Sequence, residues 1–393
     1  MPENLSKPTR IKSIDRFRGI AIALMIMFGA AKQLSSAPVF LLLSTHDVND
    51  AFLILNGFCF YDIIAPFFIF ASGLSFNLSL NTRNENGLRV SATKSLRLIG
   101  LGSFFFLPQG DPLGFVFLAF TIIAVILLPV WLYAKKKSLQ CYSFFGNFYK
   151  KYLKWLGIIT LVVAFCETVA YVMGYSDVPS SHWSVLSSIG FSMLFAILFN
   201  RYKPEIKIIF CFFLIALYYN MNLYVPAETF SYFTHGGMLG SLGWAILFLI
   251  ADIAISLRRI KPSIMYLFAS CLSVIAFISY QIITPSKAAV NLSYILISTT
   301  FSFALWAITE LFDNINIGKY DFLSIAGKNS LFLYIIHTIF MVPMGTVINA
   351  LVVLTTFTGV LAIILNATGL IAYFIGLCLI TDNLNKKGFR FRL

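Results

Sequence analysis

Long apolar runs separated by short polar segments dominate the chain, and most runs approach the length of about 20 residues that a membrane-spanning helix needs. Backbone groups in hydrocarbon must be hydrogen-bonded internally, so runs this apolar predict helices rather than a barrel. The pattern therefore predicts an all-α polytopic membrane protein with about eleven transmembrane helices, within about ten to twelve. The runs lie at about 19–35, 57–80, 96–108, 113–134, 154–174, 184–200, 206–223, 237–257, 263–284, 290–311, 329–348 and 350–381, and the last has room for one long or two short helices.

The loops between these runs alternate in charge. One set carries the cations, at 1–18, 81–97, 135–137, 150–154, 201–207, 258–261 and 383–393. The other set is poor in cations, with Lys287 as the exception, and comprises 36–55, 108–112, 175–183, 224–236 and 285–289. The positive-inside rule then places the N-terminus in the cytoplasm. We expect a single membrane domain over 1–393, with a cytoplasmic collar at 1–18 and a cytoplasmic tail at 383–393.

Composition agrees with this class. Hydrophobic residues make up 59% of the chain and charged residues only 11%, unlike a soluble domain. The net charge of +13 lies in short clusters between apolar runs, so it does not indicate nucleic-acid binding. The six cysteines are scattered without metal or disulfide spacing, so we expect buried thiols and no metal. The first run spans without a cleavage site, and we expect the bacterial cytoplasmic membrane.

The first run is preceded by a basic amphipathic collar. Arg10, Lys12, Arg16 and Arg18 surround Asp15, and Gly19 leads directly into the apolar helix. The collar marks the cytoplasmic end of this helix and supplies a cationic rim for an anionic cosubstrate.

The second run is the richest in polar groups, which are costly inside a membrane and are therefore functional candidates. Asn56 and Gly57 open it, and Asp62 stands one helical turn before Pro66. Pro66 predicts a kink that frees the carbonyl near residue 62. Asp62 either orients a catalytic group near the outer face or makes a structural bond between helices.

Histidine is the usual general base near neutral pH, and the chain has only four. His46, His182 and His235 fall in loops on the expected outer side, where each can be an ordinary polar residue. His337 falls within the eleventh run, where an imidazole needs a partner. It is either catalytic or part of a contact between helices.

Two later segments carry further candidates. Lys328 stands beside Asn329 and Ser330, either of which can cap the following helix, and a helix N-terminus favours anions. In one interpretation a phosphate-bearing cosubstrate binds there. In the other, Asn329 or Ser330 only caps the helix and Lys328 is an ordinary lysine at the membrane interface. The glycine-rich segment 234–244 allows close helix packing or close approach of a ligand. Other ionisable groups in or near runs are Lys32, Glu167, Asp252 and Glu310.

Four segments together resemble the multi-pass acyltransferases typified by heparan-alpha-glucosaminide N-acetyltransferase and its bacterial relatives. The matching residues, in family order, are Arg10, Ser13, Asp15, Arg18 and Gly19; Asn56, Gly57, Asp62, Pro66, Phe68, Phe70 and Gly73; Gly237, Leu239 and Gly240; and Gly327, Asn329, Ser330, Tyr334 and His337. Two departures stand out. Phe52 occupies the position of the family's outer-face histidine, which leaves His46, His182 or His235 as substitutes, and the usual acidic residue before Gly237 is missing.

The resemblance implies acyl transfer across the membrane from cytoplasmic acetyl-CoA, or another acyl-CoA, to an amine or hydroxyl of an external glycan or glycolipid. The implied catalytic residues are His46, Asp62, Asn56 and His337, with Tyr61 as a further oxyanion donor. The implied cosubstrate contacts are Arg16, Arg18, Arg97, Lys328, Asn329 and Ser330.

Two other functions remain open at this point. One is a multi-pass transporter or a lipid or glycan flippase without acyltransferase chemistry, although no inverted repeat is evident. The other is a catalytically silent relative that acts as a scaffold. The expected partners are the bilayer and the glycan acceptor, with a homodimer as one oligomeric option.

Overall fold

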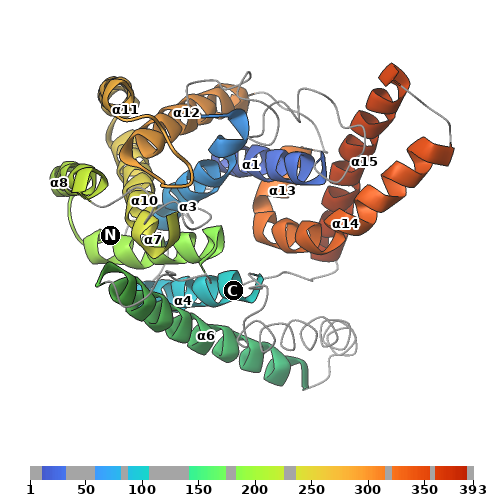
Figure 1. Cartoon of the computed structure of the whole chain (residues 1–393), viewed down its shortest axis with the longest axis horizontal. Coiled ribbons are helices and arrows are strands. Elements are labelled where there is room, and N and C mark those ends of the chain that lie inside the picture. The colour runs from blue at the N-terminus through green and yellow to red at the C-terminus, as the bar shows by residue number, and fades with distance from the viewer. Residues whose placement is uncertain are drawn as a thin grey trace, which may run out of the picture. The chain divides into compact units, whose positions relative to one another are not determined.

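The computed structural model describes residues 11–31, 58–80, 87–105, 141–173, 183–224, 236–314, 321–354 and 359–386, and the regular elements within these ranges are all helices (Figure 1). The chain divides into two compact units. The first unit comprises Met1–Ala71, Cys271–Thr284 and Ile297–Arg392, and the second comprises mainly Ser72–Ser270 and Pro285–Leu296. Helices α3, α11 and α12 therefore each contribute to both units.

The first unit is built around α1. It contains α1 (Lys12–Ala31), η2 (Phe60–Ile63), the start of α3 (Ile64–Leu80), the end of α11 (Pro262–Ile282), most of α12 (Leu292–Leu311), η4 (Phe312–Asn314), α13 (Phe322–Lys328), α14 (Ser330–Leu354) and α15 (Gly359–Lys386). Ile22 and Ile26 of α1 pack with Ala326 of α13, Leu333 of α14 and Phe374 of α15 in one buried apolar cluster. These four helices thus share a single core.

Two glycines let α1 and α13 approach closely. A Cβ on Gly19 would lie 1.9 Å from the carbonyl oxygen of Leu323, and a Cβ on Gly327 would lie 1.7 Å from that of Asp15. Side chains cannot occupy such positions, and small residues are what permit helix backbones to touch in membrane proteins. The collar and the segment around Gly327 are therefore packed backbone to backbone.

The second unit is built around α10 (Gly237–Ile260). Of the most apolar stretch of this helix, 83% is buried inside the protein. Its other helices are α4 (Gly87–Phe105), α6 (Cys141–Val172), α7 (Val185–Phe199) and α8 (Pro204–Tyr224). The glycine-rich segment starts α10 through Gly236 and Gly237, which both have positive φ. A Cβ on Gly243 would meet the Tyr218 ring at 3.0 Å, so this glycine serves helix packing.

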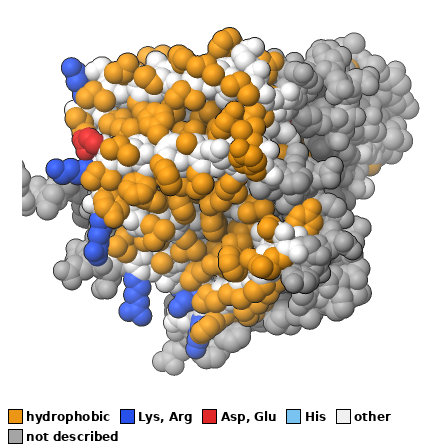
Figure 2. Space-filling model, turned by 60° about the vertical axis from the view of Figure 1, so that its left-hand side comes forward, with side chains coloured by type: hydrophobic (Ala, Val, Ile, Leu, Met, Phe, Trp, Pro, Cys, Tyr) orange, Lys and Arg blue, Asp and Glu red, His pale blue; other side chains and the backbone are white. Residues whose placement is uncertain are grey.

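Seven of the described helices are long and apolar enough to cross a membrane. These segments are Tyr61–Leu78, Tyr149–Val172, Pro204–Tyr224, Gly237–Ile260, Pro262–Ile282, Leu292–Leu311 and Ile363–Lys386. Large apolar side chains such as Trp155, Phe213 and Phe277 are more than half exposed on them, as expected of lipid-facing surfaces. Figure 2 shows a broad apolar face with Lys and Arg side chains along its edge. The fold is that of a polytopic membrane protein.

The seven helices coincide with seven of the predicted runs, and the run at 184–200 forms the shorter helix α7. The run at 113–134 lies outside the described residues, so the total of about eleven and the cytoplasmic N-terminus stay predictions. The last run holds one long helix, α15, after α14 ends at Leu354. Pro66 falls in the first turn of α3, directly after η2, where a missing N–H leaves no helical bond unmade.

Candidate active site

A histidine and a tyrosine lie together inside the first unit. His337 of α14 is only 4% exposed, and its ring centroid is 6.1 Å from that of Tyr373 in α15. Within the described part of the chain, neither Nδ1 of His337 nor the hydroxyl of Tyr373 has a hydrogen-bond partner. Buried polar atoms are nearly always paired, so two adjacent exceptions point to a place where a ligand or substrate group binds. The sequence singled out His337, but Tyr373 carried no signal within its apolar run.

Aromatic residues of the second and fourth motifs surround this pair. Tyr334 stands three residues before His337, and it packs with Phe68 of α3 and Tyr373 against the buried cluster of α1, α14 and α15. Tyr61 of η2 packs against a second buried cluster, which contains Phe28 of α1 and Ile348 of α14. Tyr61 in turn packs edge-on against Phe28 of α1, with 5.9 Å between ring centroids. The first unit thus gathers residues from three of the four predicted motifs.

Asp62 is fully buried next to Tyr61, and its nearest partners are local. Its Oδ2 accepts a hydrogen bond from the backbone N–H of Cys59 at 2.9 Å and one from the Cys59 thiol at 3.2 Å. The backbone N–H of Asp62 donates to the Cys59 carbonyl at 3.0 Å, so the two residues close the first turn of η2 on each other. The carboxylate therefore holds the entry to α3, in addition to any role toward a substrate.

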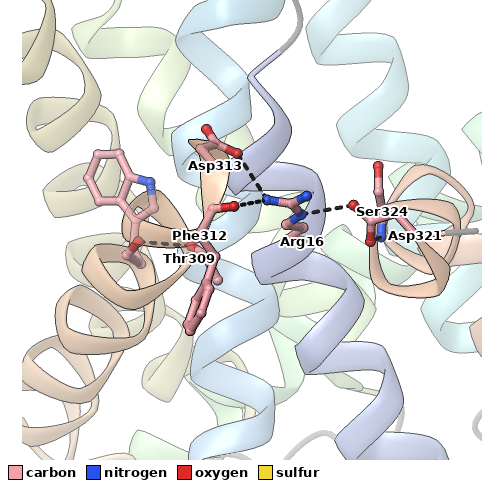
Figure 3. A network of polar contacts seen from close by, with 7 residues as sticks. Arg16, Thr309, Phe312, Asp313, Asp321 and Ser324 are labelled. Atoms are coloured by element: carbon pink, nitrogen blue, oxygen red, sulfur yellow. Dashed lines mark hydrogen bonds and ion pairs between the residues drawn. The ribbon is translucent and has the colours of Figure 1, made fainter. Parts of the chain in front are cut away.

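Arg16 lies at the centre of a polar network on α1 (Figure 3). Its Nε donates to Oδ2 of Asp321 at 2.8 Å, and one terminal nitrogen reaches the Phe312 carbonyl and Oδ1 of Asp313, the latter at 3.6 Å. The arginine side chain is 5% exposed, so the bonds form in a shielded environment. Its charge holds η4 and the N-terminus of α13 against α1.

Asp321 completes this network by capping α13. Its Oδ1 accepts a hydrogen bond from the backbone N–H of Ser324 at 3.0 Å while Oδ2 binds Arg16. Because an N-cap side chain satisfies an otherwise orphaned amide, the same carboxylate starts the helix and fixes its position. This capping residue lies six positions upstream of Gly327 and was not identified from the sequence.

The junction between α13 and α14 carries the other predicted cosubstrate contacts of this unit. Lys328 ends α13 and is exposed, Asn329 links the helices and Ser330 begins α14. Asn329 donates from Nδ2 to the Ile325 carbonyl at 2.9 Å and accepts at Oδ1 from Asn385 of α15 at 2.6 Å. Its side chain therefore ties α13 to α15 instead of capping α14, while the neighbouring Lys328 is exposed.

The remaining candidates lie elsewhere. Arg18 is half-buried on α1, two residues from Arg16. Arg97 belongs to the second unit, where its Nε donates to the Lys150 carbonyl at 3.2 Å. His46 and Asn56 lie outside the described residues.

The second unit contains a buried ion pair that the sequence did not reveal. Nζ of Lys207 in α8 lies 2.5 Å from Oδ2 of Asp252 in α10, and both side chains are almost fully buried. From sequence, Lys207 belonged to a cationic loop and Asp252 was a solitary acid. A separation of 45 residues leaves no spacing signal by which the pair could have been found.

Comparison with known proteins identifies the class. A family model described as an acyltransferase domain matches residues 11–381, nearly the whole chain. The chain belongs to the acyltransferase-3 family. No curated protein sequence matches it.

For this acyltransferase, the family match establishes membrane acyl transfer in general terms, and it covers all three motif segments that meet in the first unit. Among the described residues, no three of His, Cys, Asp and Glu gather closely enough to hold a metal ion. The described residues of the candidate site offer an imidazole, phenol hydroxyls and a carboxylate.

Proposed function

We propose that this acyltransferase moves an acetyl or other acyl group from cytoplasmic acyl-CoA to an amine or hydroxyl of an extracytoplasmic glycan or glycolipid. The proposal depends above all on His337, a buried imidazole with an unpaired Nδ1 in a protein of an acyltransferase family. His337 is the eighth residue of α14, about 10 Å along the helix from Ser330 at 1.5 Å per residue. In this proposal Ser330 lies near the cytoplasmic surface of the membrane, so that His337 lies within a hydrocarbon core about 30 Å thick, where an acyl group is shielded from water.

In this proposal His337 is the general base. It takes the proton from the acceptor hydroxyl or amine as the acceptor oxygen or nitrogen attacks the thioester carbonyl. The carbon–sulfur bond then breaks, and the proton passes from the imidazole to the departing CoA sulfur. The products are the acylated acceptor and free CoA, and the imidazole returns to its neutral form. A general base typically contributes about 100- to 10,000-fold to such a reaction.

The tyrosines supply the second requirement, which is stabilisation of the developing oxyanion. The Tyr373 hydroxyl is buried beside His337 without a partner in the described residues, so it is free to donate to a substrate oxygen. Tyr61 and Asn56 are the further donors proposed from the sequence. Donors that are already oriented toward the developing charge contribute strongly in a site that excludes water.

The CoA phosphates are proposed to bind at the cationic end of the first unit. Lys328 is exposed at the end of α13, and Arg18, Asn329 and Ser330 lie on the adjoining segments. Arg16 forms an ion pair with Asp321, so its proposed role is to hold α13, and with it Lys328, in position. The sequence also proposed Arg97 as a phosphate contact; it belongs to the second unit, and its part stays a prediction from the sequence.

The acceptor side involves the loop before α3. His46, Asn56 and Asp62 are proposed to contact or orient the acceptor, with His46 in place of the histidine that Phe52 replaces in the resemblance to heparan-alpha-glucosaminide N-acetyltransferases. The setting proposed for the reaction is the bacterial cytoplasmic membrane. The family match favours acyl transfer over transport or flipping.

The experiment uses purified full-length protein in proteoliposomes with radiolabelled acetyl-CoA supplied on one side and cell-envelope glycans on the other. The proposal expects label on the glycan and release of CoA in equal amounts. Reversing the two sides in protein of a single orientation should abolish the transfer. Absence of label transfer from acetyl-CoA and from longer acyl-CoAs would overturn the proposal, and CoA-independent movement of a glycan would support a flippase.

A further inference from the structure

A polar pocket lies in the second unit, and none of its lining residues belongs to the active site proposed above. Its volume is about 360 Å³. The helix ends that meet there are those of α3, α7 and α10, together with the start of α8. The lining residues are Asn77, Asn200, Tyr202, Pro204, Lys207, Ser256, Arg259 and Ile260. This volume falls within the range of small-molecule sites, about 300–1,000 Å³.

Hydrogen-bond donors on the pocket wall are held in place by one another. Nδ2 of Asn77 donates to Oγ of Ser256 at 3.0 Å, and Oγ of Ser256 donates to the Asp252 carbonyl at 2.8 Å. With its amide fixed in this way, Asn77 presents Oδ1 to a terminal nitrogen of Arg259 at 3.2 Å. This bond orients the Arg259 guanidinium. Because an arginine side chain has five N–H donors, further N–H groups are available to a ligand.

The buried floor of the pocket contributes little net charge. Lys207 lines the pocket, and its ammonium group is paired with Asp252 at 2.5 Å. The acid therefore does not oppose an anion above it, and the charge of Arg259 remains uncompensated by any described carboxylate within salt-bridge distance. The pair also holds α8 against α10, and so fixes the two pocket walls that these helices form.

The surroundings add positive potential. The two flanking segments, 200–207 and 256–261, carry five cations besides the paired Lys207, namely Arg201, Lys203, Arg258, Arg259 and Lys261, and one acid, Glu205. Pro204 also places the first turn of the 21-residue helix α8 at the pocket, and its N-terminal amides favour an anion. Figure 2 shows Lys and Arg side chains at the edge of the apolar face, where a membrane protein meets the lipid head groups.

We propose that this pocket binds a phosphate group, carried either by an anionic membrane lipid or by a small soluble molecule. A phosphate offers several oxygens to the Arg259 fork, the α8 amides and the Asn200 and Tyr202 side chains, and charge-assisted bonds of this kind are the strong ones. The site goes beyond acyl transfer, because its lining shares no residue with the proposed active site and binding requires no acyl donor. An interfacial phosphate would tie the bundle of α3, α8 and α10 to the head-group layer.

The test measures binding to the full chain in detergent with two probes. Native mass spectrometry counts bound phosphatidic acid, with phosphatidylcholine as the uncharged reference, and equilibrium dialysis measures inorganic phosphate. The decisive variants are Arg259→Gln and Arg258→Gln, which remove the same charge from neighbouring residues although only Arg259 lines the pocket. Arg259→Lys separates charge from geometry, because lysine keeps the charge and loses the fork.

The proposal expects Arg259→Gln to weaken binding by about tenfold, Arg259→Lys to fall between, and Arg258→Gln to leave binding almost unchanged. Binding of phosphatidic acid that inorganic phosphate does not displace identifies a lipid ligand. Displacement by inorganic phosphate identifies a soluble one. Equal losses in the two glutamine variants would show only general attraction to the basic rim, and that result, or no binding of either probe, would overturn the proposal.

Discussion

Gly327 of α13 lies directly against the carbonyl of Asp15 in α1, in a space that no side chain can share. A Cβ at position 327 would come within 1.7 Å of that oxygen, and one at Gly19 within 1.9 Å of the Leu323 carbonyl. The two glycines are 308 positions apart in the sequence (327 minus 19), yet each accommodates the other's helix. This contact fixes the position along α1 at which α13 packs, and with it the position of the start of α14.

Substituting Gly327 by alanine should therefore separate the helices. We expect Gly327→Ala to lower the free energy of unfolding by about 3 kcal/mol or more, because the obstacle is backbone rather than a movable side chain. Thermal unfolding in detergent measures this. The matched control is Gly376→Ala in α15, where a Cβ would meet nothing within 4 Å, and which should be neutral or slightly stabilising. Equal stability of the two variants would contradict the contact.

The network around Arg16 should behave as one unit. We expect Arg16→Gln to destabilise the protein by about 3 kcal/mol, because Asp321 and Asp313 would lose their shared cation. Asp321→Asn should destabilise the Arg16→Gln variant less than it destabilises the natural protein, and the coupling energy between the two substitutions should be about 1 kcal/mol or more. Simple additivity in this double-mutant cycle, measured by denaturation, would show that Arg16 does not hold α13.

The buried pair of Lys207 and Asp252 predicts an asymmetry between single and double variants. Lys207→Met alone leaves a carboxylate buried without its cation and should cost about 3–5 kcal/mol. Combining it with Asp252→Leu should recover most of that loss, because a buried ion pair contributes little more than an apolar pair of similar volume. Lys203→Met, at the exposed position directly before α8 and four residues before Lys207, is the control and should change stability by less than about 0.5 kcal/mol. A double variant as unstable as Lys207→Met would contradict this reasoning.

The membrane fold was predictable from the sequence because the cost of burying polar groups in lipid leaves a strong one-dimensional signal. Seven runs appear as spanning helices, and six of them have ends displaced by a few residues, whereas the run at 350–381 corresponds to α15, which begins only at Gly359. The segment at 350–381 was ambiguous because no proline stands between Leu354, where α14 ends, and Gly359, where α15 begins. The kink expected at Pro66 stays a prediction; Pro66 lies in the first turn of α3, directly after η2.

The site was predictable only in part. His337 was identifiable because a histidine inside an apolar run is rare, and Gly19 and Gly327 because they belong to the matched motifs. Tyr373, Asp321 and the partner of Lys207 were not identifiable. Their roles arise from which helices pack together, and a single sequence contains no information about pairs so far apart.

The most direct test of the account is the rate of acetyl transfer from acetyl-CoA to cell-envelope glycans by His337→Gln, with Thr338→Ala as the control on the exposed side of the same turn. The account predicts that His337→Gln lowers the rate by at least about 100-fold at unchanged thermal stability, that Tyr373→Phe lowers it less, and that Thr338→Ala matches the natural protein. A His337→Gln variant that folds and transfers acetyl groups at the natural rate would contradict the assignment of the base.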